Sequence, residues 1–584
     1  RLAYRILQET GGNMGKLLED TGKSMVLQKV VQMHKGQLPY LGGQMKRPGC
    51  LDEVKSLISE FLLYDIGDSD LEDMVKRAKQ QPLLHMKLQD VQVLYKGFKE
   101  YLEGHYITGE EILDALLPAV PLSEKLKDSV IVLDGFTGFT PIQVKVIREL
   151  LAVCQKVMVT VTMDGTGDVF AKGKPHQLFY MSRQMIHILS ALTRDLEEPV
   201  CLTTDEKSRF SQAPALRFLE KHIFRYSRKK YEDPQEEIQI YTAGTPEKEL
   251  EEAARRIRRL VRTQGMKYGE IAVITGNLEE YGNIASQVFE RAGIPYFIDE
   301  KHTVLMNPFV EYIRAAVEMV FTGFSYEGVF RYLRCGMSGL TREETDHLEN
   351  YVIALGIRGF NRWQEHWTRI YRGMEAEDIL KINESRARFV EEVYDFAEIF
   401  GKGRKKVEQY CRGLYDFIVK GQIQEKLKKQ ELYFKSVGDT AMEKEYGQIY
   451  GIVMDLLDRM VEILGNELVT VQEFRQLLET GLSKAKVALI PPSMDQVLVG
   501  DMERTRLKKI KALFFVGVNE GNIPKAADTG GILNEMDRDF FAEEGVELAP
   551  GPKELMNMQR FYLYLNLTKP EKLLCLSFCS SNSK

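Results

Sequence analysis

At 584 residues, the chain is too long for a single ordinary hydrophobic core, and its length predicts about three or four domains. Hydrophobic residues at 44% and charged residues at 28% are typical of a globular protein in water, and no apolar run is long enough to cross a bilayer. The formal charge of −6 neither indicates nor excludes a nucleic-acid partner, because local patches decide phosphate binding. Seven cysteines, scattered apart from Cys575 and Cys579, favour the reducing cytoplasm over a disulfide framework.

Residues 1–127 are predicted to be mostly helical, because long amphipathic runs alternate with glycine and proline. The first residues lack an initiator methionine and a signal-peptide pattern, so we expect the chain to be part of a longer protein. Thr21-Gly22-Lys23-Ser24 has the ending of a phosphate-binding loop, but Leu17 stands where that loop requires its first glycine. We also predict no strand before it, and therefore interpret this segment as a helix boundary.

From about residue 128 the pattern changes to strand, helix and strand. Residues 130–133 are apolar and mostly β-branched, and 156–164 form a second apolar segment. Between them, Thr140 as a helix cap and Pro141 as the first helical residue predict the start of a helix. This order is typical of a parallel-sheet unit.

A second series of this kind begins near residue 237, where Thr245 and Pro246 predict a helix after a strand. The segment 325–480 is predicted to be helical and contains the two tryptophans, Trp363 and Trp367, which we expect to pack in a core. Strand-like segments then return, so the second sheet is predicted to be split by a helical insertion. Cys575 and Cys579 are expected to be ordinary strand residues, because a single pair cannot fill a tetrahedral metal site.

The stretch VIVLDGFTGFTPIQ at 130–143 contains a carboxylate that could bind a metal ion. A buried strand that runs into Asp134 would present a carboxylate at the C-terminal edge of a sheet, where nucleotide hydrolases hold magnesium. A working motor would carry a glutamate next, to orient and deprotonate the attacking water. Here the next residue is Gly135, so the catalytic base is missing.

This stretch resembles the second motif of UvrD-type superfamily 1 helicases. The positions that fit are Asp134, Phe136, Thr140 and Gln143. The stretch at 490–524 is similar to a later helicase motif, which in those proteins carries a histidine and a Lys-Gly-Leu-Glu run. The residues found there instead are Gly500, Asp501, Arg504 and Arg506.

The closing stretch is similar to the sixth helicase motif. Gln559, Arg560, Tyr564 and Thr568 match it, whereas Lys569 and Pro570 stand where the motif has arginine and alanine. Lysine cannot reproduce the planar fork of arginine. Over nearly its whole length, the chain closely resembles the AddB family, the B subunits of bacterial ATP-dependent helicase/deoxyribonucleases (AddAB).

The resemblance implies an α/β fold with two RecA-like parallel-sheet domains, each interrupted by a largely helical insertion. The domains expected are a helical subdomain at 1–127 inserted in the first RecA-like domain, the remainder of that domain at 128–236, the second RecA-like domain at 237–324 and 481–584, and its helical insertion at 325–480. The family further implies an N-terminal strand with a glycine-rich loop, and a C-terminal nuclease domain with a four-iron four-sulfur cluster, all outside these residues. ATP and magnesium would belong to the full-length protein, and we expect removal of the first strand to expose a hydrophobic slot.

The function that the resemblance implies is that of a DNA-binding, motor-inactive part of a helicase–nuclease that processes double-strand breaks for homologous recombination. Its partners would be single-stranded DNA, duplex ends and, in a heterodimer, the A subunit that carries the motor and a nuclease. It would recognise a regulatory sequence in single-stranded DNA. We expect no catalytic residue and no metal site in this chain. Vestigial nucleotide-site positions are Asp134, Gln143 and Arg560.

Candidates for DNA contact are basic residues near aromatic ones, which can bind phosphates while stacking on bases. These candidates are Arg225, Tyr226, Arg228, Lys229, Lys230, Arg504 and Arg506. The run at 255–259 is expected to alternate between solvent and acidic neighbours such as Glu251 and Glu252, and Phe136 and Phe139 are expected to be core residues. A solvated helix end explains the segment at 225–230 equally well.

Two other functions remain open from the sequence. The chain could belong to an active superfamily 1 ATPase whose phosphate loop lies outside it, in which case Gly135→Glu would change little. It could also be a scaffold that contacts only its protein partner, which predicts no salt-dependent affinity for single strands.

Overall fold

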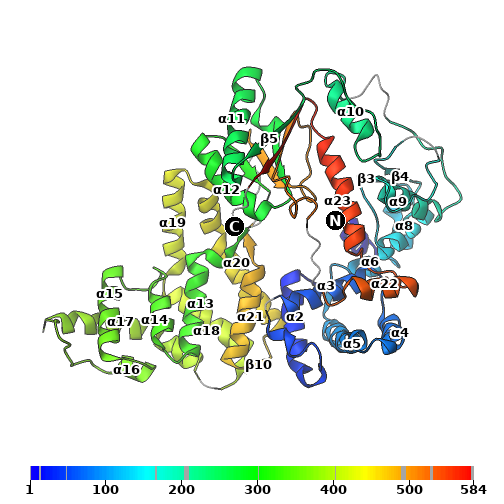
Figure 1. Ribbon diagram of the computed structural model, residues 1–584. Coiled ribbons are helices and arrows are strands. Elements are labelled where there is room, and N and C mark those ends of the chain that lie inside the picture. The colour runs from blue at the N-terminus through cyan, green and yellow to red at the C-terminus, as the bar shows by residue number, and fades with distance from the viewer. Residues whose placement is uncertain are drawn as a thin grey trace.

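The computed structural model describes residues 2–11, 15–47, 49–164, 168–202, 209–299, 302–375, 377–401, 403–487, 495–525 and 531–580. Its elements form an N-terminal helical group, a small parallel β-unit, a six-stranded parallel sheet and a second helical group (Figure 1). The predicted α/β class, with parallel sheets and large helical insertions, is confirmed and is consistent with a RecA-like helicase fold. The domain boundaries stay predictions.

The N-terminal group is built on amphipathic helices. They are α1 (Leu2–Thr10), α2 (Asp20–Met33), α3 (Cys50–Leu63), α4 (Asp68–Arg77), α5 (Pro82–Leu102), α6 (Ile112–Leu116) and α7 (Glu124–Lys127), with the parallel pair β1 (Lys16–Leu18) and β2 (Tyr106–Thr108). Gly22 and Lys23 lie in the first turn of α2, so the predicted helix boundary is confirmed, whereas the prediction that no strand precedes it is wrong. Lys23 is buried, and its Nζ lies 2.9 Å from Glu110 and 2.7 Å from Asp20. Its charge is therefore already paired.

The small β-unit consists of β3 (Val130–Asp134), α8 (Pro141–Val153) and β4 (Lys156–Thr160), with the two strands parallel. The predicted start of α8 is confirmed, because the Thr140 backbone N–H donates to Gln143 Oε1 at 3.0 Å. The prediction that β3 is buried is wrong: Val130 is 49% exposed and Val132 is 56% exposed. Side chains alternate between the two faces of a sheet, and Met158 of β4, which pairs with Val132, is exposed as well. This face of the β3–β4 unit is therefore uncovered among the described residues. Helices α9 (Tyr180–Ser190) and α10 (Pro214–His222) follow.

The six-stranded sheet interleaves two distant parts of the chain. Its strands are β5 (Ile238–Ala243), β6 (Ile271–Thr275), β7 (Tyr296–Ile298), β12 (Val497–Asp501), β13 (Ala512–Val516) and β14 (Leu573–Cys579). They lie in the order β5-β14-β13-β6-β12-β7, and all neighbours are parallel. Because β6 pairs with both β12 and β13, the strands before and after the insertion fold as one unit.

Alternate strand residues face two separate cores. Val273 and Phe514 pack under α11 (Pro246–Gln264) and α12 (Leu278–Ala292). Ile274 and Phe515 face the opposite way, toward α10 and α23 (Pro552–Leu567). Helix α22 (Glu535–Glu543) instead contributes Phe541 to the core of the N-terminal helices.

The second helical group is inserted between β7 and β12. It contains α13 (Pro308–Phe321), α14 (Tyr326–Leu333), α15 (Arg342–Leu355), α16 (Phe360–Gln364), α17 (Asp378–Ile399), α18 (Val407–Lys420), α19 (Ile423–Val437), α20 (Thr440–Leu464) and α21 (Val471–Lys484), with the two-residue strands β8 (His302–Thr303), β9 (Lys405–Lys406), β10 (Leu468–Val469) and β11 (Lys486–Val487). Trp363 and Trp367 are 1% and 5% exposed, which confirms their predicted packing role. Lys484 Nζ lies 2.7 Å from Asp52 Oδ2, so the two helical groups touch each other. Among the described helices, none has the length and apolar composition of a membrane span.

Candidate functional site

The three stretches that carry the helicase resemblance line one cavity of about 290 Å³ between the β3–β4 unit and the six-stranded sheet. The turn after β3 contributes Gly135 and Thr137, the loop after β12 contributes Arg506, and α23 contributes Tyr562. The hydroxyls of Thr137 and Tyr562 lie 3.5 Å apart. In Figure 1, α23 stands between β5 and the β3–β4 unit, so this helix forms the wall that joins them.

The turn after β3 is fixed by local contacts. Thr160 on β4 donates its hydroxyl to Asp134 Oδ1, which ties that carboxylate to the neighbouring strand. Gly135 has a φ of +70°, in the left-handed region that side chains disfavour. A glutamate base would therefore have to adopt a strained backbone here. Phe136 is 45% exposed, so its predicted core role is wrong. Its ring lies 5.1 Å from that of Phe139, which is itself only partly buried, and Phe136 lines the cavity.

The loop after β12 is held by a buried carboxylate. Asp501 Oδ1 accepts from the backbone N–H groups of Glu503 (2.9 Å) and Arg504 (3.2 Å), and Oδ2 lies 3.0 Å from Lys525 Nζ. Thr505 accepts from the Asp501 N–H at 2.9 Å, and a side chain at position 500 would approach the Thr505 hydroxyl to 2.2 Å. Only glycine fits there, and the resulting turn presents the Arg504 and Arg506 side chains to solvent.

Helix α23 is anchored at its C-terminal end, where it borders the cavity. Asn566 Nδ2 donates to the Met502 carbonyl at 2.8 Å, which joins the helix to the loop after β12. The Arg209 guanidinium donates to the Thr568 carbonyl, one of the backbone acceptors that the end of a helix leaves open. Desolvation raises the pKa of Tyr564 to about 12, so its hydroxyl keeps the proton that it donates to Glu220 (2.9 Å).

A second cavity, of about 600 Å³, continues from the first and is strongly cationic. Arg209 and Lys569 line both cavities, and Lys508 and Lys509 join them in the second, where Glu571 is the acidic neighbour. Desolvation lowers the pKa of Arg209, and desolvation together with the charge of Arg209 lowers the pKa of Lys569. These like charges are held close together, and an anion would stabilise them. We call the two joined cavities the basic cleft.

The predicted DNA-binding residues fall into two groups. Arg225 is engaged inside the protein: its Nε and Nη2 lie 3.1 and 2.8 Å from Asp164 Oδ1, and its guanidinium lies 5.1 Å from the rings of Phe179 and Tyr564. Desolvation opposes its charge, but the bonds to Asp164 prevail and raise the pKa of Arg225. Arg225 therefore fixes the start of the 225–230 segment to the rest of the protein. Exposed side chains follow it at Tyr226, which is 75% exposed, and at Arg228, Lys229 and Lys230.

The other predicted residues lie at or near the basic cleft. Arg506 lines it, and Arg504 is exposed on the same loop, whereas the 226–230 segment does not line it among the described residues. Residues 488–494, at the start of the stretch that carries Arg504 and Arg506, lie outside the described residues. The run at 255–259 behaves in part as predicted, because Arg255 and Arg256 pair with Glu252.

The vestigial nucleotide positions each have a local role. Asp134 binds Thr160, Gln143 caps α8, and Arg560 Nη1 donates to the His176 carbonyl at 3.2 Å. No contact joins the three within the part of the chain that the structure describes. Their contacts with one another therefore do not define a phosphate or magnesium site among the described residues, and the three positions stay predictions.

The cysteines do not fit an iron–sulfur cluster either. Cys575 and Cys579 are buried in β14, as predicted for strand residues, and Cys579 Sγ lies 3.1 Å from the Tyr281 hydroxyl. Among the described residues, no three histidine, cysteine or acidic side chains gather as metal ligands. What the cleft can do chemically is bind an anion.

Sequence reasoning missed four cations of the basic cleft as binding residues. Lys508 and Lys509 could have been found, since they directly follow Arg504 and Arg506 in the basic run of the same loop. Lys569 was noticed only as a departure from a motif. Arg209 has no local signal, because only the packing of α10 against α23 brings it to the cleft.

Comparisons with known proteins agree with the motif resemblance. A family described as "ADDB, N-terminal" matches residues 1–220. Proteins named as the B subunit of an ATP-dependent helicase/deoxyribonuclease match nearly the whole chain. The relative from Lachnoclostridium phytofermentans is 43% identical over 99% of this chain and 51% of its own length. Those from Clostridium novyi and Caldanaerobacter subterraneus subsp. tengcongensis are 33% and 34% identical, over 100% and 99% of this chain and 51% and 50% of their own lengths.

The chain thus spans about half the length of the curated relatives that it matches. Within that half, the identity runs through both helical groups and both β-units, because the matches cover 99% of the chain or more. The chain belongs to the family of the ATP-dependent helicase/deoxyribonuclease B subunits.

Proposed function

We propose that this chain is the helicase-like, DNA-binding part of the B subunit of an ATP-dependent helicase–nuclease. In this proposal the chain holds single-stranded DNA in the basic cleft, while its partner, the A subunit, supplies the motor. The assembled enzyme would process DNA double-strand breaks for homologous recombination. The names of the relatives support this place in the enzyme.

The observation that carries the DNA-binding role is the unpaired charge of the loop after β12. Arg504, Arg506, Lys508 and Lys509 are all exposed, and none has a carboxylate partner among the described residues. Cations closely spaced along one loop bind a chain of phosphates by releasing its counterions.

The turn after β3 supports a role without a motor. Its glycine replaces the base that would activate water, and its positive φ disfavours that base. Exposed aromatic side chains at Phe136 and Tyr226 could stack on unpaired bases of any sequence, which supports binding of a single strand. Recognition of a regulatory sequence in that strand is a finer part of the proposal, and it rests on the family resemblance.

The test is fluorescence anisotropy of a labelled thymidine oligonucleotide with this chain over a salt series, without and with the A subunit. We expect binding that weakens steeply as the salt concentration rises. In Lys508→Ala/Lys509→Ala, the slope of the logarithm of the binding constant against the logarithm of the salt concentration should become shallower by about 1.4, at about 0.7 per lost single-strand phosphate contact. The matched control is Lys381→Ala/Lys429→Ala, which removes the same charge from exposed positions of α17 and α19. A folded chain that binds no strand under either condition would favour the scaffold function instead.

A further inference from the structure

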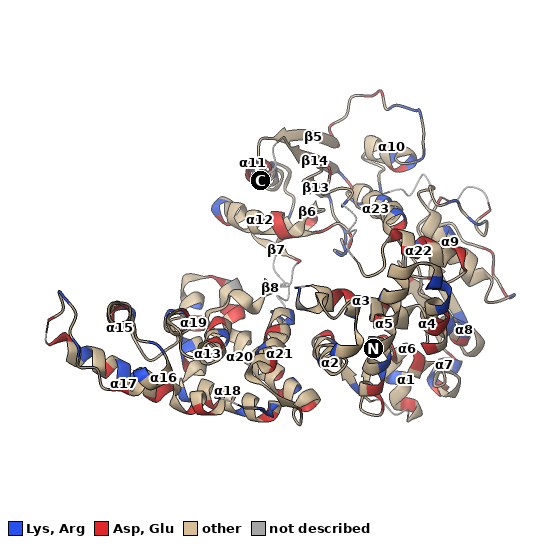
Figure 2. Cartoon of the chain, turned by 60° about the horizontal axis from the view of Figure 1, so that its bottom comes forward, with Lys and Arg blue, Asp and Glu red and all other residues tan. Residues whose placement is uncertain are grey.

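A second cationic surface lies on the face of the six-stranded sheet that is turned away from α23. Helices α11 and α12, seen on that side in Figure 2, border a groove of about 570 Å³. Its arginines are Arg255, Arg258, Arg259 and Arg262 on α11 and Arg291 on α12. We call this surface the arginine groove. It is separate from the basic cleft, because the sheet lies between them.

Part of this charge is free to bind a ligand. Arg255 pairs with Glu252, and Arg291 Nη2 lies 2.6 Å from Glu247 and 3.5 Å from Glu251, the acidic residue that lines the groove. By contrast, the guanidinium groups of Arg258, Arg259 and Arg262 have no acceptor or aromatic partner among the residues that the structure describes. Three of the five arginines therefore keep their full hydrogen-bonding capacity.

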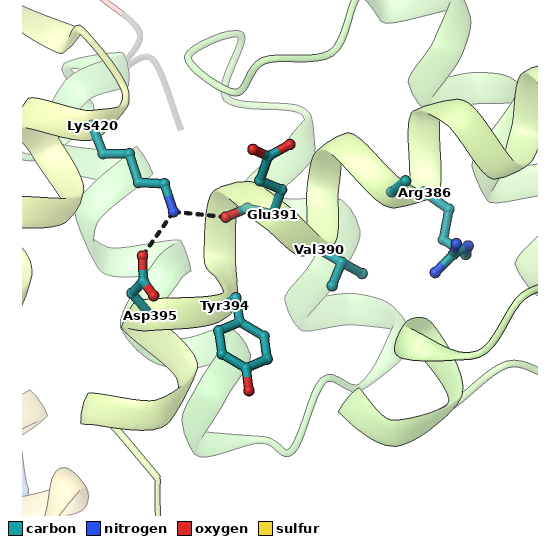
Figure 3. Close-up of a pocket in the computed structure, with 7 residues that line it drawn as sticks. Arg386, Val390, Glu391, Tyr394, Asp395 and Lys420 are labelled. Atoms are coloured by element: carbon teal, nitrogen blue, oxygen red, sulfur yellow. Dashed lines mark hydrogen bonds and ion pairs between the residues drawn. The ribbon is translucent and has the colours of Figure 1, made fainter.

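The cavity between α17 and α18 contains, by contrast, a lysine whose charge is paired within the protein. There Lys420 Nζ donates to the Glu391 carbonyl and to Asp395 Oδ2, both at 2.8 Å (Figure 3). Its ammonium already has two oxygen partners, and the cavity needs no anion. The arginine groove lacks such internal partners for Arg258, Arg259 and Arg262 among the described residues.

The spacing of the arginines suits a phosphate backbone. Arg255, Arg258 and Arg262 follow one another at three and four residues, so they form one stripe with steps of about 4.5 and 6 Å along the helix axis. A DNA strand advances about 3.4 Å per phosphate, so each guanidinium can serve one or two phosphates. Arginine also binds phosphate oxygens in a bidentate way.

The neutral part of the groove argues against an acidic protein as its ligand. Its floor consists of Ala254, Val288 and Ala292, of which the first two are each 3% exposed. No large apolar side chain is exposed along α11 or α12, both of which are described in full. Protein partners need such anchors, because a few buried apolar and aromatic side chains dominate their binding energy. A polyanion needs none.

The absence of exposed aromatic residues on these two helices also separates the groove from the basic cleft. Tyr281 and Phe289, the central aromatic residues of α12, are 1% and 0% exposed. No aromatic side chain is exposed along the described α11 and α12, so the groove lacks the stacking platform of single-strand sites and suits DNA whose bases are hidden in a duplex. We propose that the arginine groove binds the phosphate backbone of double-stranded DNA, beyond the single strand proposed for the basic cleft.

The test compares blunt duplex DNA with a thymidine oligonucleotide, each labelled, by anisotropy over a salt series. In Arg258→Ala/Arg259→Ala/Arg262→Ala we expect the salt dependence of duplex binding, measured by the same logarithmic slope, to become shallower by about 2.7, at about 0.9 per lost phosphate contact. Single-strand binding should stay unchanged. Lys508→Ala/Lys509→Ala should do the reverse. Failure of single-strand binding alone would contradict the proposed function, while the duplex slope would still report on the groove.

The matched control is Lys79→Ala/Lys381→Ala/Lys429→Ala, which removes three exposed charges outside the groove and the cleft. Replacement of the three arginines by lysine keeps the charge but removes the fork, so it should retain most of the slope and bind more weakly. Thermal melting checks that every variant is folded. The proposal is overturned if the alanine triple variant binds duplex DNA with the same affinity and slope as the control, even if an acidic peptide binds the groove.

Discussion

At position 135, backbone geometry and catalytic chemistry make opposing demands. The turn after β3 requires a φ of +70°, which glycine adopts freely. A motor would require a glutamate at that position. This chain satisfies the geometric demand, so the turn keeps its shape at the edge of the basic cleft.

Gly135→Glu should therefore lower the free energy of unfolding by about 1–2 kcal/mol, the usual penalty for a side chain in the left-handed region. Gly138→Glu is the matched control, because Gly138 lies in the same turn, has no positive φ and has open space around its Cβ. Urea denaturation followed by circular dichroism measures both. Equal stability of the two variants would show that φ at position 135 imposes no constraint.

At the scale of elements, the loop after β12 has its shape because Gly500, Asp501 and Thr505 pack without space for another atom. A Cβ at position 500 would meet the Thr505 side chain at 2.2–2.6 Å. We expect Gly500→Ala to cost about 1–3 kcal/mol of stability and to weaken single-strand binding, because the loop must shift. Gly451→Ala, in α20 with no atom within 4 Å, should instead stabilise by about 0.5–1 kcal/mol. If Gly500→Ala melts and binds like the wild type, the loop is not held as described.

The entrances to β6 and β13 are joined by an ion pair, with Glu270 Oε1 2.6 Å from Lys511 Nζ. The bond to Lys511 lowers the pKa of Glu270 below its ordinary value of 4.5. This stabilisation is complete above that value and is lost as the pH falls through the lowered pKa. Because both groups are partly exposed, the pair contributes less than about 1 kcal/mol.

The difference in melting temperature between the wild type and Glu270→Gln should thus be present at neutral pH and close in acid. Melting curves from about pH 7 to about pH 3 follow this difference, with Glu384→Gln on the exposed surface of α17 as a control, because Glu384 has no ion pair among the described residues. A difference that widens in acid would contradict the assigned sign.

At the scale of the whole molecule, the interleaved sheet could be predicted because its strands are buried on both faces and have continuous apolar sequences. β6 and β13 are buried at every position, and such runs are distinctive. Helix starts at Thr140 and Thr245 were equally plain, because capping is local. The exposure of β3 could not be predicted from its own residues, since it depends on which elements cover that face of the sheet.

The basic cleft could be predicted only in part for the same reason. The resemblance pointed to the turn after β3, the loop after β12 and α23, and these do line one cavity. The sequence does not show which acidic residue pairs with each cation. Arg225, for example, is the first basic residue of its segment, yet its charge is paired with Asp164. Pairing depends on residues that are distant in sequence, and composition carries no record of them.

Amide hydrogen exchange with and without a thymidine oligonucleotide tests whether the basic cleft holds single-stranded DNA. We expect slower exchange in residues 502–510 and 135–137, at the cleft, and little change in α13–α21. Lys508→Ala/Lys509→Ala should reduce that protection. Protection confined to the helical insertion, with the cleft exchanging as in the free protein, would contradict the account.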